Sequence, residues 1–205
     1  HLATSFVTGG DQDSSKEAYR TSQNAWLSAD ELLERIQYRL GQLLGMTESE
    51  AMSFRAAAEE LQVIKYDVGG QFKVHHDSAD FHPRVLTLLI YLNDIEVSNT
   101  GRTGAGTWFP YAGQNGISHE GIDSVDDANR RALSAYANEV FEDLGIVEVP
   151  RRGNAVLFFN HVPSGAKDPL AVHAGLPVGS GEEDSMRGVS KWAANYWFRS
   201  FEPKS

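Results

Sequence analysis

The 205-residue sequence contains no cysteine, and this absence excludes several chemistries at once. Without thiols the chain cannot form disulfides, thiolate zinc sites, iron–sulfur clusters or a cysteine nucleophile. Any metal must therefore be bound through nitrogen and oxygen, for which seven histidines and 28 acidic residues are available. The length suits one domain with a sizeable core, and we treat residues 1–205 as a single domain.

Basic residues and long apolar runs are also scarce. Lysine and arginine total 18 against 28 acidic residues, and the formal charge of −10 argues against nucleic acid as a partner. No apolar run is long enough for a membrane segment, and the first residues lack the basic and apolar regions of a signal peptide. Because the chain begins with His1, we expect a domain excised from a longer protein.

The pattern along the chain predicts helices first and strands afterwards. Residues 1–24 are polar and are expected to form an arm. Apolar residues recur at helical spacing over 29–44, with Ser28 as predicted N-cap and Gly45 as the end, and a second helix is expected over 47–58. Seven runs rich in β-branched and aromatic residues predict strands at 60–66, 72–77, 84–92, 106–109, 154–159, 171–177 and 191–199. Such an order favours an antiparallel sandwich or barrel backed by helices.

Two insertions interrupt the strands. The first, 113–144, contains a predicted helix over 123–144, which we expect to be a solvated surface helix; covering the active site or binding a partner are the alternatives. The second, 178–190, is rich in glycine and acidic residues and is expected to form a mobile loop.

His75 and Asp77 are the strongest candidates for metal ligands. Residues two apart on a strand share a face, so this imidazole and this carboxylate would point the same way. Together they supply two ligands of a facial triad, the ligand set of non-haem Fe(II) oxygenases. The third must come from another strand, and His173, beside the small residues Ala174 and Gly175, is the best candidate. A His-x-Asp triplet alone is a weak signal, and scattered surface histidines are the alternative.

A second unusual residue opens the run 191–199. Lys191 stands in an apolar, aromatic strand, on the face that also carries Asn195, Trp197 and Arg199. A lysine in such a strand needs an anionic partner or an exit to solvent. An exposed lysine at the strand end is the simpler alternative.

Nine motifs follow one another along nearly the whole chain. They are Arg20-Thr-Ser-Gln-Asn-Ala-Trp-Leu27, Leu61–Tyr66, Gly70-Gln71, His75-x-Asp77, Arg84–Asn93, Gly106–Pro110, Gly153–Phe159, His173–Val178 and Lys191-Trp192. In this order they resemble the 2-oxoglutarate- and Fe(II)-dependent prolyl 4-hydroxylases of the collagen, plant and algal type. The resemblance implies an α+β, mainly β fold: a double-stranded β-helix (jelly-roll) core backed by the N-terminal helices.

The same resemblance implies a role for individual residues. The three iron ligands would be His75, Asp77 and His173. Lys191 would pair with the distal carboxylate of 2-oxoglutarate, and Tyr66 and Thr107 match hydroxyl groups that hydrogen-bond this carboxylate. A cation with two hydroxyl groups makes a sound anion site in a dry barrel.

Three further residues match positions that contact the peptide or line its groove. They are Arg84, Trp197 and Arg199, although the family usually has a different residue at the position of Arg199. The implied substrate is a proline-rich peptide in the polyproline II form, which suits an aromatic-lined groove.

The implied reaction is hydroxylation of peptidyl proline at the 4-position, with 2-oxoglutarate decarboxylated to succinate and carbon dioxide. Fe(II), 2-oxoglutarate, O2 and ascorbate are the implied cofactors and cosubstrates. Two alternatives remain: a 2-oxoglutarate oxygenase for another residue or a small molecule, and a non-catalytic peptide-binding barrel. The resemblance suggests the secretory pathway (ER/Golgi), with the cytoplasm as the alternative, and predicts no particular oligomeric state.

Overall fold

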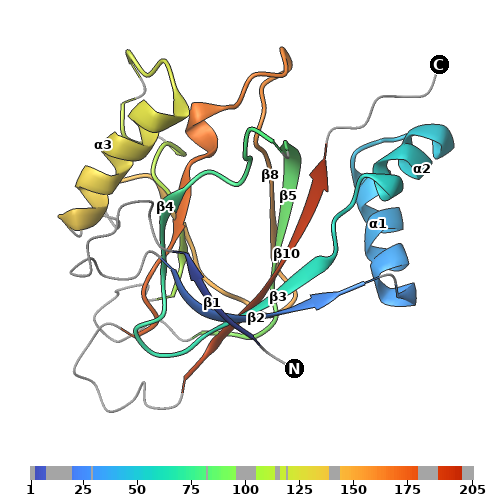
Figure 1. The fold of residues 1–205 in the computed structure, drawn as a ribbon, viewed down its shortest axis with the longest axis horizontal. Coiled ribbons are helices and arrows are strands. Elements are labelled where there is room, and N and C mark those ends of the chain that lie inside the picture. Colours follow the sequence, from blue (N-terminus) through green and yellow to red (C-terminus); the bar gives the residue numbers. More distant parts are fainter. Residues whose placement is uncertain are drawn as a thin grey trace.

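One curled antiparallel sheet makes up most of the structure, with helices on its outside (Figure 1). The computed structural model describes residues 3–7, 20–28, 30–81, 83–95, 105–113, 116–118, 120–138, 144–179 and 189–199. The strands in these ranges are β1 (Ala3–Val7), β2 (Arg20–Leu27), β3 (Leu61–Tyr66), β4 (Phe72–His75), β5 (Arg84–Tyr91), β6 (Thr107–Phe109), β7 (Ile146–Glu148), β8 (Ala155–Phe159), β9 (His173–Gly175) and β10 (Lys191–Arg199). Hydrogen bonds join them in the order β7-β6-β9-β4-β2-β3-β10-β5-β8, and β1 pairs with β2. The prediction of a mainly β fold is confirmed.

The curl brings the two ends of this strand order face to face. The rings of Phe109 on β6 and Phe158 on β8 meet edge to face, with centroids 5.4 Å apart. Phe158 also lies 4.9 Å from the ring of His173 on β9. Side chains that point inward from β4, β5, β9 and β10 therefore share one interior.

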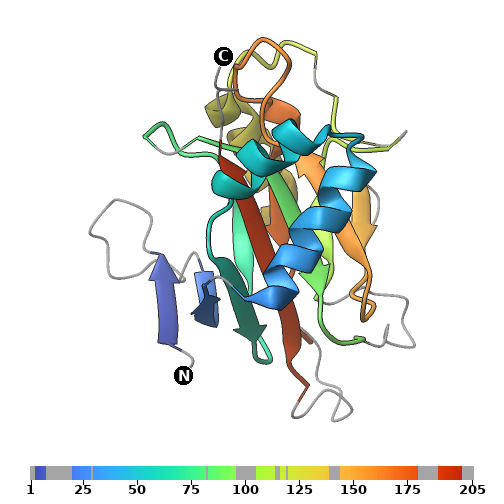
Figure 2. The same ribbon diagram turned by 90° about the vertical axis from the view of Figure 1, so that its right-hand side faces the viewer.

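Helices α1 (Glu31–Leu43) and α2 (Glu48–Ala56) cover the outer face of the sheet (Figure 2). Side chains alternate along β10, so Tyr196 and Phe198 face these helices while Trp197 faces the interior. The resulting core consists of Leu33, Leu40, Phe54, Leu61, Leu86, Ala194, Tyr196 and Phe198. Both helices and their contact with the sheet confirm the prediction from helical spacing.

Helix α3 (Val125–Ala137) packs on the opposite arm of the sheet. Ala128 and Ala132 are fully buried against a core that includes Val74 of β4 and Trp108 of β6. The Tyr111 hydroxyl donates to the carbonyl oxygen of Ala128 at 2.7 Å. The small residues of α3 let one face pack closely, while Arg130 and Leu133 on the helix remain exposed. The prediction of a surface helix is confirmed at Val125–Ala137, a shorter range than the predicted 123–144.

The largest correction concerns the N-terminal segment 1–24. Its described residues, 3–7 and 20–24, do not form an arm: they belong to β1 and β2, and β2 lies in the middle of the sheet between β3 and β4. Arg20 and Ser22 of β2 are polar yet buried, because Arg20 Nε donates to Ser22 Oγ at 2.9 Å. Hydrogen bonding makes burial of such groups affordable.

Smaller differences lie at the ends of elements. The N-cap of α1 is Asp30, whose carboxylate accepts from the Leu32 amide, rather than Ser28. The predicted strand 171–177 is only β9, because η1 (Pro169–Ala171) occupies its start. The short strand β7 was not predicted. Most of the predicted mobile loop 178–190, with residues 180–188, lies outside the described residues.

In the part of the chain that the structure describes, no helix combines the length and apolar character that crossing a membrane requires.

Phe54→Ala tests the core between α2 and the sheet. The Phe54 side chain is 1% exposed, and its ring stacks on that of Phe198 with centroids 4.0 Å apart. Its loss leaves a cavity, so we expect the free energy of unfolding to fall by about 3–5 kcal/mol in guanidinium denaturation. Met52→Ala on the same helix, where Met52 is 64% exposed, should change it by less than about 0.5 kcal/mol. Equal losses would contradict this packing.

Candidate functional site

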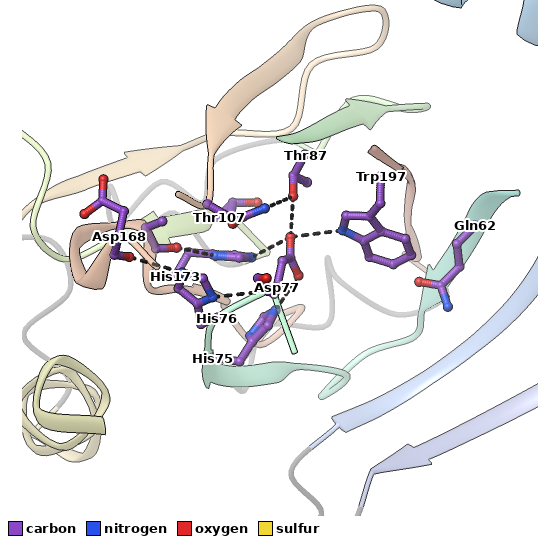
Figure 3. A network of polar contacts seen from close by, with 12 residues as sticks. Gln62, His75, His76, Asp77, Thr87, Thr107, Asp168, His173 and Trp197 are labelled. Atoms are coloured by element: carbon purple, nitrogen blue, oxygen red, sulfur yellow. Dashed lines mark hydrogen bonds and ion pairs between the residues drawn. The ribbon is translucent and has the colours of Figure 1, made fainter. Parts of the chain in front are cut away.

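The structure brings His75, Asp77 and His173 together in the interior of the sheet (Figure 3). Each offers one ligand atom, and these atoms lie within 4.8 Å of one another. His75 ends β4 and is paired in register with His173, the first residue of β9. Asp77 follows two residues after the end of β4, so the chain turn as well as the strand sets its position. His76 bonds elsewhere, through Nε2 to the Asp168 carbonyl oxygen at 3.1 Å.

Main-chain carbonyl groups determine which nitrogen of each imidazole faces Asp77. Nδ1 of His75 lies 2.7 Å from the Lys73 carbonyl oxygen, and Nδ1 of His173 lies 3.0 Å from that of Ala171. A carbonyl oxygen only accepts, so both Nδ1 atoms carry the proton. Nε2 is then the ring nitrogen left for a metal, and the two Nε2 atoms lie 3.6 and 3.8 Å from the Asp77 oxygens. Metal-binding histidines are oriented in this way.

The charges of this cluster suit a cation. Burial alone would raise the pKa of Asp77, but the imidazoles of His173 and His75 and the indole N–H of Trp197 hold that pKa well below its usual value. Burial lowers the pKa of His173 to about 4. The carboxylate is therefore ionised and the imidazole neutral at neutral pH, which are the protonation states that metal binding requires.

Aromatic rings hold the two imidazoles in place. The ring of Phe72 stacks on His75 with centroids 3.6 Å apart and planes inclined by 16°. Phe109 stacks on His173 at 5.6 Å, while Phe158 meets His173 edge to face. These contacts restrict rotation of both rings and keep the cluster in apolar surroundings.

Lys191 forms a separate, cationic part of the interior. Its side chain is buried at 3% exposure, so the alternative of an exposed lysine at the strand end is wrong. Nζ lies 3.5 Å from the Gly106 carbonyl oxygen and 5.8 and 5.7 Å from the ring centroids of Tyr66 and Tyr91. No carboxylate among the described residues pairs with it, and burial lowers the pKa of Lys191 to about 7. A buried ammonium without a counter-ion is suited to bind an anion.

Hydroxyl-bearing residues are found in the same part of the interior. Tyr66 pairs with Lys191 across β3 and β10, and burial raises the pKa of Tyr66, so its phenol stays protonated. The buried Thr107 accepts a hydrogen bond from the Tyr91 hydroxyl at 2.9 Å, which leaves the Thr107 proton for another acceptor. Together with Lys191 these donors suit a carboxylate. Tyr91 was missed from the sequence, although alternation along β5 places Thr87, Leu89 and Tyr91 on one face.

The three predicted peptide-contacting residues also lie together, around an acid that sequence reasoning missed. Both Nε and an Nη of Arg84 bond to the Glu59 carboxylate, at 2.9 and 2.8 Å, and Arg199 Nε bonds to it at 3.1 Å. The Arg84 guanidinium lies 3.7 Å from the ring centroid of Trp197. Beside them is a pocket of about 500 Å³ that Trp26, Glu59 and Arg199 line.

The chain belongs to the 2OG-Fe(II) oxygenase superfamily, whose family model matches residues 61–199. It is similar in sequence to prolyl 4-hydroxylases in particular. It is 30% identical to Prolyl 4-hydroxylase 5 of Arabidopsis thaliana over 206 residues, which cover 96% of this chain and 58% of that protein. The chain spans about half the length of the curated plant relatives that it matches.

Solved structures show the same fold. The viral collagen prolyl hydroxylase of Paramecium bursaria Chlorella virus-1, solved with 2OG, matches with a TM-score of 0.55 and 22% identity over 89% of this chain and 80% of that one. A prolyl hydroxylase of Trichoplax adhaerens, solved with a hypoxia inducible factor peptide fragment, matches with a TM-score of 0.51 and 16% identity over 88% and 63% of the two chains. At this identity the similarity concerns the fold.

The lowered pKa of Lys191 predicts a pH-dependent stability of the ligand-free chain. Folding moves this pKa from its ordinary 10.5 to about 7, so between these values the unfolded state binds the additional proton. Stability therefore rises with pH across this window, by at most about 1.4 kcal/mol per pH unit. We expect the free energy of unfolding of the wild type, relative to Lys191→Met, to increase from pH 7 to pH 9 in urea denaturation. A constant difference would mean that Lys191 titrates normally.

Proposed function

We propose that the chain is an Fe(II)- and 2-oxoglutarate-dependent oxygenase that hydroxylates peptidyl proline at the 4-position. One observation carries this proposal: a His-Asp-His cluster and a buried lysine without a counter-ion share one interior. Membership of the oxygenase superfamily supports it. We also infer that the curled sheet is a double-stranded β-helix, because its two ends face each other across the site.

His75, Asp77 and His173 would hold the iron. Two imidazoles and one carboxylate are the donor set of facial-triad Fe(II) sites. When bound, the iron and 2-oxoglutarate supply the oxidising chemistry, in which the oxo acid is converted to succinate and carbon dioxide. The chain itself would hold the ligands in place, through the hydrogen bonds of both Nδ1 atoms and the ring stacked on His75.

Lys191, Thr107 and Tyr66 would bind the distal carboxylate of 2-oxoglutarate. The negative charge supplies the partner that Lys191 lacks among the described residues, and the hydroxyl groups add neutral donors. The anion would restore the ordinary charged state of the lysine, because an opposite charge raises the pKa that burial lowers.

A proline-rich peptide is the proposed partner. Arg84 lies over the ring of Trp197, Arg199 bonds to the same Glu59 as Arg84, and Trp26 lies 6.1 Å from Trp197 between ring centroids. An extended polyproline II segment loses little entropy on binding to such aromatic and guanidinium surfaces. Relatives with prolyl hydroxylase names support this choice over a small molecule.

A turnover assay tests this function directly. The chain is incubated with Fe(II), ascorbate, 2-oxoglutarate and a panel of proline-containing peptides, and mass spectrometry detects and locates one added oxygen. We expect hydroxylated proline and equivalent succinate with the wild type and neither with His75→Ala, which loses a metal ligand while remaining folded by circular dichroism.

Other results identify the alternatives. Succinate without any hydroxylated proline would favour a different substrate on the same scaffold. Peptide binding without turnover of 2-oxoglutarate would favour a non-catalytic barrel. Unchanged turnover by His75→Ala would contradict the assignment of the metal ligands.

Lys191→Ala tests the 2-oxoglutarate site separately. Loss of a charge-assisted bond predicts that the KM for 2-oxoglutarate rises by about 10- to 100-fold while the KM for peptide changes little. Lys65→Ala is the matched control, because Lys65 lies on β3 and pairs instead with Asp67 at 2.7 Å. Equal changes in both KM values for Lys191→Ala would place the lysine outside the 2-oxoglutarate site.

A further inference from the structure

Among the described residues, hydroxyl and indole donors reach only one of the two oxygens of the Asp77 carboxylate. Oδ2 accepts the Thr87 hydroxyl at 2.8 Å and the Trp197 indole N–H at 3.1 Å (Figure 3). Each oxygen also faces one imidazole, Oδ1 that of His75 with Nε2 at 3.6 Å and Oδ2 that of His173 with Nε2 at 3.8 Å. Two strands supply the donors, β5 and β10, which are paired in register at Thr87 and Trp197. The sheet therefore treats the two carboxylate oxygens differently.

A third residue fixes the direction of the Thr87 hydroxyl. Nδ2 of Asn160 lies 2.9 Å from Thr87 Oγ1. A hydroxyl group has one proton, and an ionised carboxylate can only accept, so the Thr87 proton must point to Asp77. Thr87 Oγ1 must then accept from the Asn160 amide. The order of donors is thus Asn160, Thr87, Asp77.

Both relay residues are rigidly placed. Thr87 is 1% exposed and Asn160 is fully buried. Both main-chain polar groups of Asn160 are hydrogen-bonded. Its N–H donates to the Val85 carbonyl oxygen, and its carbonyl oxygen accepts from the Asp168 N–H, each at 2.9 Å. Its side-chain Oδ1 has no hydrogen-bond partner in the described structure. Burying an amide with an unpaired oxygen costs free energy. The hydrogen bond from Nδ2 to Thr87 is therefore the contact that accounts for an asparagine at this position.

We propose that Asn160 and Thr87 form a positioning relay that, together with Trp197, occupies Oδ2 of Asp77 and leaves Oδ1 as the oxygen offered to a divalent cation. The inference rests on the proposed metal site and adds two residues outside its ligand set. Without the relay the Asp77 carboxylate can rotate and its two oxygens can exchange places. Binding of the cation must then also fix the orientation of the carboxylate. Loss of such an outer contact typically weakens metal affinity by about 10- to 100-fold.

The test is binding of Co(II) alone to the ligand-free 205-residue chain. Thr87→Val keeps the shape of the side chain and removes the hydroxyl, so we expect Kd to rise by about 10- to 100-fold and the absorption spectrum of bound Co(II) to change. Thr87→Ser keeps the hydroxyl and should restore both affinity and spectrum. Trp197→Phe removes the second donor and should weaken binding in the same direction.

Controls separate this role from a structural one. Thermal unfolding without metal shows whether each variant is folded. Thr21→Val removes a sheet hydroxyl that accepts instead from the Gln71 amide, at 3.1 Å, and should bind Co(II) like the wild type.

Each remaining result decides the question. A Kd of Thr87→Val for Co(II) within twofold of the wild-type value would overturn the proposed relay. Co(II) binding by Thr87→Ser as weak as that by Thr87→Val would also overturn it. If Thr87→Val does not fold, Trp197→Phe within twofold of the wild type overturns it. A wild type that binds no Co(II) would reject the proposed metal site itself, and the relay with it.

Discussion

The buried carboxylate of Asp77 is the group on which the rest of the site depends. It lies between two imidazoles whose Nδ1 atoms bond to main-chain carbonyl oxygens, so both Nε2 atoms and the carboxylate face one another. Such a cluster is stable only if a cation or strong donors compensate the charge. Thr87 and Trp197 compensate it on one side, and the other side is left for a metal.

The curl of the sheet makes this arrangement possible. Asp77 follows β4, and its neighbours come from β4, β5, β9 and β10. These strands form two adjacent pairs, β9-β4 and β10-β5, which β2 and β3 separate in the strand order. Closing the sheet until Phe109 meets Phe158 brings them into one interior. The helices α1 and α2 pack on the outside, so the residues of β10 that face them stabilise the fold while the alternate residues serve the site.

The same interior has a buried charge of opposite sign. Lys191 lacks a carboxylate partner among the described residues, and burial lowers its pKa to about 7. The His75, Asp77 and His173 cluster is thus suited to bind a cation, and Lys191 is suited to bind an anion. A dicarboxylate that also coordinates a metal answers both, which is why the geometry fits 2-oxoglutarate better than a simple anion.

Sequence patterns predicted what depends on local periodicity. Helical spacing located α1 and α2, and alternation located β10 at its observed bounds. The His-x-Asp triplet identified two of the clustered residues, although Asp77 lies beyond the strand. Sequence patterns failed where contacts between distant residues determine the structure. The central place of β2 depends on pairing between its polar groups. Thr87 and Glu59 have their roles only through partners elsewhere in the chain.

The most direct test of the account is the affinity for 2-oxoglutarate, measured by calorimetry without oxygen, with and without Co(II). A single interior that holds both groups predicts that the metal tightens 2-oxoglutarate binding by about tenfold or more, and that Asp77→Asn abolishes this coupling. The same affinity with and without the metal, or full coupling in Asp77→Asn, would contradict it.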